Sequence, residues 1–488
     1  MSSRTEKVIV ITLAAVSLFS AFGMRFAFWG DEAGTFEIIS ESWHGFWRWF
    51  VEGEPHPPLY FALLKIWAII FGKSEIALRM PSVLFYPLVV YLTWLLSRKI
   101  GLSQTGRLFA VGIVALHPSL WIHFRMARYY SMTTFLFLYN TILLFEVMEK
   151  GKWRWVVYGI CLALLFWTNF PAYIVVPLHF FIIILRDRKR VGMWVVCNAL
   201  ALISAALPLL FLIKTTISYG EDAMPSIISL LMSLLYGVYS FLIGEARYPW
   251  QVATAIGLIA AIFLAIRGMV MRPKDSLVLF VGPVIVSLSI ISLVFQKLGF
   301  IYINARLSFL FPMVAIGMAF GTERLRKGFL MIIMVMIGVG YIWGISGVIT
   351  GKDYHNAVYV MPWKEIVNET KLLGVEAGIC RDWGAIHYIK QKMDGYLMRD
   401  YMYRDLPDGK IAFISRSGAF KMLGWNENVY KELETGRGKP VAKLEYIKEN
   451  PIVLCLKKQF LKYDFPDYIT TVYIFPEIEV NNVSRVSR

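Results

Sequence analysis

Charged residues are scarce in this chain. Only 17% of its 488 residues are Asp, Glu, Lys or Arg, whereas 57% are hydrophobic. An ordinary soluble domain has about a quarter of its residues charged, so the composition excludes that class. The mean hydropathy of +0.56 points in the same direction, and we expect a membrane protein.

Cysteine is also scarce, with 4 residues in the whole chain. Cys161 and Cys197 lie within apolar runs, where cysteine usually acts as a small hydrophobic residue. Cys380 and Cys455 lie in the more polar C-terminal part, where an oxidising compartment would allow them to pair. The sequence leaves both a disulfide and two free thiols open. No Cys/His spacing is typical of a zinc site.

Instead, the chain contains repeated uncharged apolar runs, close to the roughly 20 residues that a helix needs to cross the hydrocarbon core. They lie near residues 8–24, 80–97, 108–124, 129–145, 155–185, 191–213, 248–266, 276–296, 307–322 and 329–351. The run 155–185 is too long for one crossing, and Asn169-Phe170-Pro171 divides it. No small-residue cleavage site follows the first run, which argues against a signal peptide. We therefore predict an all-α polytopic membrane protein with about eleven transmembrane helices.

The basic residues indicate the orientation of the chain. If segments 57–72 and 223–244 are not spans, all basic clusters fall on one side, which the positive-inside rule makes cytoplasmic. These clusters are Arg4/Lys7, Arg98/Lys99/Arg107, Lys150/Lys152/Arg154, Arg186/Arg188/Lys189/Arg190, Arg267/Arg272/Lys274 and Arg324/Arg326/Lys327. We expect a multi-pass protein of the cell membrane with a cytoplasmic N-terminus, and the two excluded segments on the outer surface. The net charge of +16 then reflects short loops, so nucleic acid is not an expected partner.

The apolar runs stop near residue 350. Beyond it, β-like stretches such as Ile411–Ser415 and Ile452–Leu456 alternate with helix-like ones such as Trp383–Met393. We predict a small extracytoplasmic α/β domain over 351–488, within the usual size range of a domain. It follows a transmembrane catalytic domain of residues 1–350, which includes a large first external loop over residues 25–79.

An acidic pair, Asp31 and Glu32, directly follows the first apolar run. Carboxylates so close to a bilayer are costly unless they serve an ion, proton or substrate site. One interpretation is an N-cap and a first-turn acid, both of which favour a helix start. The other is a base that takes a proton from an acceptor hydroxyl. Adjacent residues point in different directions, so one of the pair should lead and the other support it.

Three basic residues share the predicted outer side with this pair. His56 precedes two prolines and is expected in an extended segment, where it is structural, donates a hydrogen bond to a phosphate, or acts as an acid. Arg128 and Arg306 lie at the outer ends of spans. They either extend into the headgroup region or hold a phosphate through paired hydrogen bonds.

The order of these motifs resembles the GT-C superfamily of membrane glycosyltransferases. The resemblance is greatest to the branch that contains protein O-mannosyltransferases and lipid A aminoarabinose transferases. The matching motifs are Asp31-Glu32, His56-Pro57-Pro58-Leu59, Ala127-Arg128-Tyr129-Tyr130-Ser131, and Asn304-Ala305-Arg306-Leu307 with Pro312 in the following span.

The resemblance implies the GT-C fold and an inverting transfer from a polyprenyl-phosphate sugar, such as a dolichyl-phosphate sugar, to a protein, lipid or glycan. It implies that Asp31 is the catalytic base and that Glu32 is its partner. The residues implied for the donor phosphate are His56, Arg128 and Arg306, and the weaker candidates for substrate binding are Tyr129 and Tyr130. The lipid bilayer is the setting of this reaction.

The chain departs from the family in places. Many relatives have Glu where Met126 stands, the aminoarabinose transferases have Lys where His56 stands, and Ala33-Gly34-Thr35 follows the acidic pair where a basic residue is usual. Only one short cluster of carboxylates is present, and hard cations usually require several oxygens. We predict neither a metal site nor an obligatory cofactor, although a divalent cation stays open.

A polytopic transporter or flippase of a lipid-linked saccharide is the alternative function. Such proteins tend to have internal repeats and helices broken at the bilayer midplane. No internal repeat is evident here, and the charges cluster at the outer ends of the predicted spans. The sequence therefore favours the enzyme.

Overall fold

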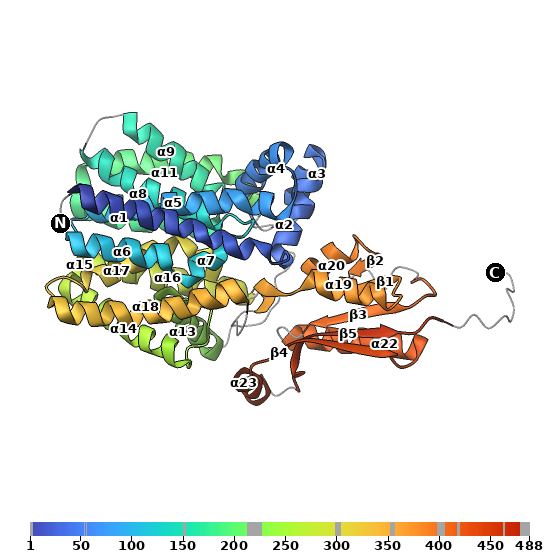
Figure 1. Cartoon of the computed structure of the whole chain (residues 1–488). Coiled ribbons are helices and arrows are strands. Elements are labelled where there is room, and N and C mark those ends of the chain that lie inside the picture. The colour runs from blue at the N-terminus through green and yellow to red at the C-terminus, as the bar shows by residue number, and fades with distance from the viewer. Residues whose placement is uncertain are drawn as a thin grey trace. The chain divides into compact units, whose positions relative to one another are not determined.

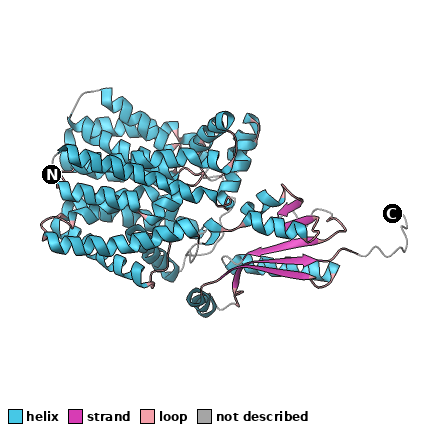
Figure 2. Ribbon diagram, viewed as in Figure 1, coloured by secondary structure: helices cyan, strands magenta, loops and turns pink. Residues whose placement is uncertain are grey.

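The structure is a computed structural model. It describes residues 3–52, 54, 56–149, 153–211, 227–297, 304–351, 357–397, 406–416, 420–461 and 464–478. The chain divides into two compact units, of which the first comprises Met1–Arg25 with Thr35–Asn356, and the second Phe26–Gly34 with Ala357–Arg488. The described part of the first unit is helical, and the strands belong to the second (Figure 2).

The first unit is a bundle of apolar helices, in which α1, α5, α6 and α8 pack side by side (Figure 1). Its main helices are α1 (Ser3–Ser17), α5 (Glu75–Lys99), α6 (Gln104–Leu116), α8 (Tyr130–Glu149), α9 (Trp153–Phe166), α10 (Val175–Arg186), α11 (Val191–Ser204), α13 (Ile227–Ile243), α14 (Val252–Met271), α16 (Gly282–Lys297), α17 (Phe311–Phe320) and α18 (Lys327–Thr350). Its other elements are η1 (Leu18–Arg25), α3 (Trp43–Glu52), α4 (Leu59–Phe71), α7 (Pro118–His123), η2 (Phe170–Ile174), η3 (Arg188–Arg190), α15 (Pro273–Ser276), η4 (Leu277–Val281) and η5 (Asn304–Leu310). Helix α2 (Gly30–Ser40) contains the boundary between the units.

Membrane-length helices are present, as the composition predicts. Five stretches of the described residues are long and apolar enough to cross a bilayer: Ser3–Arg25, Glu75–Lys99, Tyr130–Glu149, Val252–Met271 and Lys327–Thr350. The shorter apolar helices are Leu59–Phe71, Gln104–Leu116, Trp153–Phe166, Phe170–Arg186, Leu234–Ile243 and Asn304–Phe320. The prediction of a helical membrane protein is confirmed, whereas the number of eleven crossings stays a prediction.

The predicted division of the run 155–185 is confirmed. Helix α9 ends at Phe166, and the next helical segment begins at Phe170 with Pro171 in its first turn. Proline lacks a backbone N–H and crowds the preceding turn of a helix, which favours a break at Pro171, although α5 continues through Pro81 and Pro87. The side chain of Asn169, at this break, donates to the carbonyl of Arg306 at 3.2 Å.

The two segments excluded as spans differ in how much the structure describes. Helix α4 covers 13 residues of the first segment. The burial of the charged Lys65 in this helix is explained by its hydrogen bonds to two backbone carbonyls at the end of α2. The ammonium donates to the carbonyl of Ile39 at 3.0 Å and to that of Glu41, as suits a cation at a helix C-terminus. The second segment forms α13 from Ile227 onward, whereas 223–226 lie outside the described residues.

The second unit contains a five-stranded sheet in the order β2-β1-β3-β5-β4. Strand β1 pairs in parallel with β2 and β3, and β5 pairs antiparallel with β3 and β4. The strands are β1 (Ala377–Cys380), β2 (Asp394–Leu397), β3 (Ile411–Arg416), β4 (Ala442–Lys448) and β5 (Tyr468–Phe475). The helices are η6 (Ala357–Val360), α19 (Trp363–Leu372), α20 (Trp383–Ile389), α22 (Phe420–Arg437) and α23 (Pro451–Leu461). Ile379, Phe413 and Phe475 contribute to its core.

One element prediction for this unit is wrong. The stretch Ile452–Leu456 is not a strand but part of α23. Asn450 caps this helix, because its Oδ1 accepts from the backbone N–H groups of Ile452 at 3.0 Å and Val453 at 3.4 Å. Pro451 then occupies the first turn, where proline is favourable. Local capping thus overrides the β-branched composition.

The other two element predictions fare better. Ile411–Ser415 is a strand, as predicted, and forms most of β3. The helix predicted over Trp383–Met393 is present as α20 but ends at Ile389, and β2 starts at Asp394.

All four cysteines are free in the structure. Cys380 is buried in β1 and Cys455 is exposed on α23, so no disulfide joins them. Cys161 and Cys197 are buried in α9 and α11, as expected of small hydrophobic residues.

Candidate active site

The two acidic residues occupy the first turn of α2. The backbone N–H of Trp29 donates to Glu32 Oε2 at 3.4 Å. An acid that reaches back to the N–H group three residues earlier is one half of a capping box. Glu32 is buried, with 1% of its surface exposed. It therefore contributes to the start of α2, whereas Asp31 precedes it on another face of the same turn.

Arg128 lies inside the first unit, with 3% of its surface exposed. Its Nη2 lies 3.2 Å from His56 Nε2, and its Nη1 donates to Thr35 Oγ1 at 3.1 Å. The guanidinium carbon stands 5.5 Å from the ring centre of Phe61 and 5.2 Å from that of Tyr129. These contacts come from several elements, so this arginine is held by protein groups rather than extended toward a headgroup.

His56 is held between Arg128 and Glu54. Its Nδ1 contacts the Glu54 carboxylate, and its ring centre lies 5.4 Å from that of Tyr129. Because Arg128 can only donate, Nε2 accepts and the proton of the neutral ring is assigned to Nδ1. Burial lowers the pKa of His56, and the charges of Arg128 and Arg306 act in the same direction, against Glu54. The histidine is thus neutral near pH 7.

This shifted pKa predicts acid sensitivity. The ordinary pKa of His56 is 6.5, and folding lowers it, so the unfolded chain binds the proton more readily than the folded one. The free energy of unfolding should be unaffected by His56 above about pH 6.5 and should fall as the pH decreases toward the lowered pKa. Unfolding temperatures in detergent at pH 7.5 and pH 5.0 measure this. His56→Asn should lose less stability over that interval, and an equal loss would contradict the expectation.

Arg306 lies on η5 and is buried, with 7% of its surface exposed. Ser308 Oγ on the same element donates to the carbonyl of Tyr130 at 3.3 Å, so η5 packs against the start of α8. The charge of Arg306, like that of Arg128, lowers the pKa of His56. The structure thus brings the two predicted arginines and the histidine together.

Asn304, at the start of η5, was missed as a site residue by the sequence analysis. It is fully buried. Among the described residues, neither polar atom of its side chain has a hydrogen-bond partner. Buried amides are rarely left unpaired, so Asn304 is a candidate to bind a polar ligand beside Arg306. Its position two residues before that arginine is the only signal in the sequence.

The two tyrosines adjoin this group. Tyr129 and Tyr130 are both buried, and their ring centres lie 4.9 Å apart. Tyr130 also lies against His123, with 5.9 Å between the ring centres. Of the predicted site residues, all but the acidic pair therefore lie close together in the first unit, whereas Asp31 and Glu32 belong to the second unit.

A further buried polar cluster was also missed. His123 Nε2 lies 2.6 Å from Glu245 Oε1, and both side chains are almost fully buried. Tyr236 donates to Glu245 Oε2 at 2.5 Å, and Ser119 Oγ accepts from the backbone N–H of Glu245 at 3.0 Å. The sequence signals for this cluster were His123 within one apolar run and Glu245 beside another apolar run. These contacts join α7 to the segment that follows α13.

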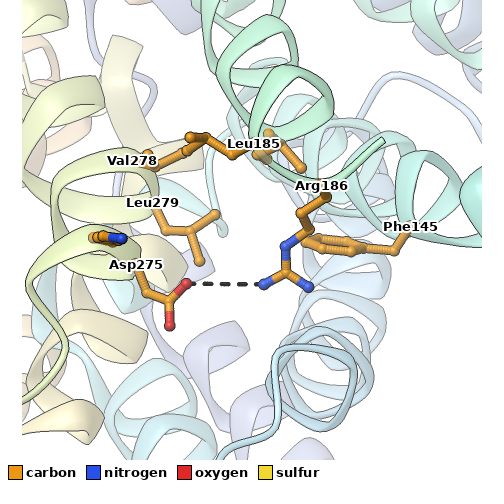
Figure 3. A pocket seen from close by; sticks show the side chains of 8 residues that line it. Phe145, Leu185, Arg186, Asp275, Val278 and Leu279 are labelled. Atoms are coloured by element: carbon orange, nitrogen blue, oxygen red, sulfur yellow. Dashed lines mark ion pairs between the residues drawn. The ribbon is translucent and has the colours of Figure 1, made fainter. Parts of the chain in front are cut away.

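No group of three or more His, Cys, Asp or Glu side chains that could hold a metal ion occurs in the described part of the chain. One cavity of about 250 Å³ lies elsewhere in the first unit, between α8, α10 and the α15–η4 segment (Figure 3). Arg186 Nη2 stands 3.8 Å from Asp275 Oδ1 at its edge. None of the predicted site residues lines this cavity.

Comparisons with known proteins give a family match and a shared fold. Residues 55–212 match the family model described as Dolichyl-phosphate-mannose-protein mannosyltransferase. The crystal structure of ArnT from Cupriavidus metallidurans in the apo state is similar with a TM-score of 0.54 at 11% identity, over 97% of this chain and 98% of that chain. The same ArnT bound to undecaprenyl phosphate gives a TM-score of 0.47 at 11% identity, again over 97% and 98% of the two chains.

Arabinofuranosyltransferase AftD from Mycobacteria is also similar, with a TM-score of 0.48 at 12% identity. The match covers 98% of this chain but only 40% of that one. A search of curated proteins gives no match.

Proposed function

Since the family match and the shared fold confirm the resemblance to GT-C membrane glycosyltransferases, we propose that this protein moves a sugar from a polyprenyl-phosphate donor to an acceptor at the outer face of the membrane. The observation that supports this most strongly is the group formed by the buried Arg128 and Arg306 and the partly buried, neutral His56. Two guanidinium groups and a neutral histidine are well suited to hold a phosphate.

The charges explain why a phosphate fits there. The positive charges of Arg128 and Arg306 both disfavour protonation of His56, whereas Glu54 favours it. Guanidinium groups can bind a phosphate oxygen pair through paired, charge-assisted hydrogen bonds. During transfer, the bond between the sugar and the phosphate breaks and the phosphate keeps the electron pair. Donors that are already in place stabilise that growing charge.

Asp31 supplies the base in this proposal. Residues four apart share one face of a helix, so Asp31 lies on the same face of α2 as Thr35, the residue to which Arg128 donates. Asp31 takes the proton of the acceptor hydroxyl while the acceptor oxygen attacks the anomeric carbon opposite the phosphate. The configuration at that carbon is inverted. Glu32 supports Asp31 by holding the first turn of α2.

The experiment is a donor-transfer assay. Purified protein in vesicles of its native lipids is incubated with radiolabelled undecaprenyl-phosphate and dolichyl-phosphate sugars, and label is measured in protein, lipid and free glycan. Undecaprenyl phosphate is the first carrier to test, because the similar ArnT binds it. Transfer with release of the polyprenyl phosphate supports the proposal. Movement of intact donor across the vesicle membrane without transfer supports the transporter instead.

We also propose that residues 351–488 form an extracytoplasmic domain and that the N-terminus is cytoplasmic, since the basic clusters then face the cytoplasm. In a variant without native cysteines, Lys189→Cys should resist an impermeant thiol reagent in intact cells. Thr435→Cys should react, and both positions are exposed in the structure. Permeabilised cells, in which both should react, are the control. The reverse labelling pattern in intact cells would overturn this orientation.

A further inference from the structure

The cavity between α8, α10 and the α15–η4 segment is lined by both apolar and charged side chains (Figure 3). Its buried members, Phe145, Ile182 and Leu279, are apolar. Arg186 and Lys274, which also line it, are exposed. A cavity with an apolar inner part and charges toward its opening suits an amphiphile, a molecule with one apolar and one charged part.

This cavity lies where helices of the bundle end. Helix α14, one of the candidate spans, ends at Met271, and Lys274 follows on α15. Phe145 lies in the last two turns of α8, another candidate span. Arg186 is the last residue of α10. A helix of about 20 residues crosses the hydrocarbon core, so the cavity lies at the level of the lipid headgroups.

The backbone beside the cavity is irregular. Pro273 cannot continue α14 as a regular helix because it lacks a backbone N–H, and Arg272 before it has non-helical angles, with φ −136° and ψ 67°. Element η4, which contributes Val278 and Leu279 to the cavity, is a π-helix. Turns of this kind are rare and are frequent at functional sites. The irregular segment thus borders the cavity that its own side chains line.

The two cations of the lining have hydrogen-bond donors to spare. The Arg186 guanidinium carbon lies 4.9 Å from the ring centre of Phe145. Its Nη2 faces Asp275 Oδ1 across 3.8 Å (Figure 3), which is too long for a hydrogen bond. Within the described residues, Lys274 makes no hydrogen bond or ion pair. An oxygen-rich anion can therefore bind both cations without breaking a hydrogen bond that either makes to a described residue.

The charges of the lining favour an anion. Arg186 and Lys274 contribute two positive charges and Asp275 one negative charge, which gives a net charge of +1. Arg272 lies 3.7 Å from Asp275, but it is already paired with Glu323 at 2.7 Å, so these two together leave the sum unchanged. A phosphodiester carries one negative charge at neutral pH and compensates this net charge.

We propose that this cavity binds the headgroup phosphate of an anionic phospholipid. Arg186 can hold two phosphate oxygens through paired hydrogen bonds, and Lys274 adds a second cation. The glycerol and the first acyl carbons then cover Leu279 and the other apolar lining residues, which a free phosphate would leave without a partner. Basic pockets between transmembrane helices bind lipid headgroups in this way. The site is separate from the proposed active site, none of whose predicted residues lines the cavity.

The experiment counts lipids bound to the purified full-length protein by native mass spectrometry. Protein freed of copurified lipid is titrated with dioleoyl phosphatidylglycerol or with dioleoyl phosphatidylcholine, whose choline cancels the phosphate charge. Phosphatidylglycerol should bind at least roughly tenfold more tightly, because the charge of its phosphate is not cancelled. Inorganic phosphate and glycerophosphoglycerol are added as soluble competitors and should not displace it. Equal affinity for the two lipids overturns the proposal, and displacement by inorganic phosphate shows a phosphate site instead of a lipid site.

Variants then assign the binding to this cavity. Arg186→Gln should weaken phosphatidylglycerol binding roughly tenfold or more, because a charge-assisted contact is lost. Arg186→Lys should restore it only in part, because paired hydrogen bonds are lost. Lys189→Gln is the matched control. Lys189 is an exposed cation three residues further along that does not line the cavity, so its loss should leave the affinity unchanged.

Unfolding temperatures in detergent without lipid show whether the variants remain folded. Loss of phosphatidylglycerol binding by folded Arg186→Gln, but not by Lys189→Gln, supports the proposal. An equal loss in both variants means that the lipid is attracted by the basic end of the bundle as a whole, and unchanged binding in Arg186→Gln means that it binds elsewhere. Either result overturns the site.

Discussion

Asp31→Asn is expected to lower the rate of sugar transfer by about a hundredfold to ten-thousandfold, the usual contribution of a positioned base. Asparagine keeps the size and most hydrogen bonds of the side chain but cannot accept the proton of the acceptor hydroxyl. Donor binding and folding should be retained, so kcat and kcat/KM should fall together. Initial rates with a radiolabelled lipid-phosphate sugar, together with the unfolding temperature, measure this.

Glu32→Gln is the matched control for this result. The Glu32 side chain holds the first turn of α2 by accepting from Trp29, and glutamine serves equally well at that position of a capping box. We therefore expect a much smaller loss of transfer than for Asp31→Asn. If the two variants lose transfer equally, the acidic pair acts as one unit. Near-normal transfer by Asp31→Asn would reduce the pair to a helix cap and favour the transporter.

Arg128→Ala and Arg306→Ala are each expected to weaken donor binding roughly tenfold to a hundredfold. Each removes a charge-assisted contact, worth about 1.5–3 kcal/mol. Arg→Lys at either position should restore binding only in part, because a lysine cannot form paired hydrogen bonds with a phosphate. Equilibrium binding of a labelled polyprenyl-phosphate sugar to the purified protein measures the effect.

The control for the arginines is Arg98→Ala. Arg98 lies in the last turn of α5 and stacks on Trp94, with its guanidinium carbon 4.8 Å from the ring centre. It shares charge and span-end position with the two site arginines but not their burial, so its loss should leave donor affinity unchanged. Normal donor binding by both Arg128→Ala and Arg306→Ala would mean that these residues serve only to anchor their helices.

Much of the fold could be predicted because the responsible signals are local. A long uncharged apolar run predicts a membrane helix wherever it packs, and Asn169-Phe170-Pro171 favours a helix end because proline lacks the backbone N–H. The same holds for the strand at Ile411–Ser415. The prediction from composition fails for Ile452–Leu456, because the composition allows a strand or a helix equally and the cap at Asn450 decides for the helix.

The features of the candidate site likewise divide into those that the sequence predicts and those that tertiary packing decides. Composition and motif order determined by themselves that this is an apolar, helical membrane chain with an acid, a histidine and two arginines in GT-C order. Only the tertiary structure decided that Arg128 meets His56 and Thr35 and that Asn304 lies buried beside Arg306. Such partners are far apart in sequence, and packing rather than local pattern brings them together. Burial then sets how strongly their charges act on one another.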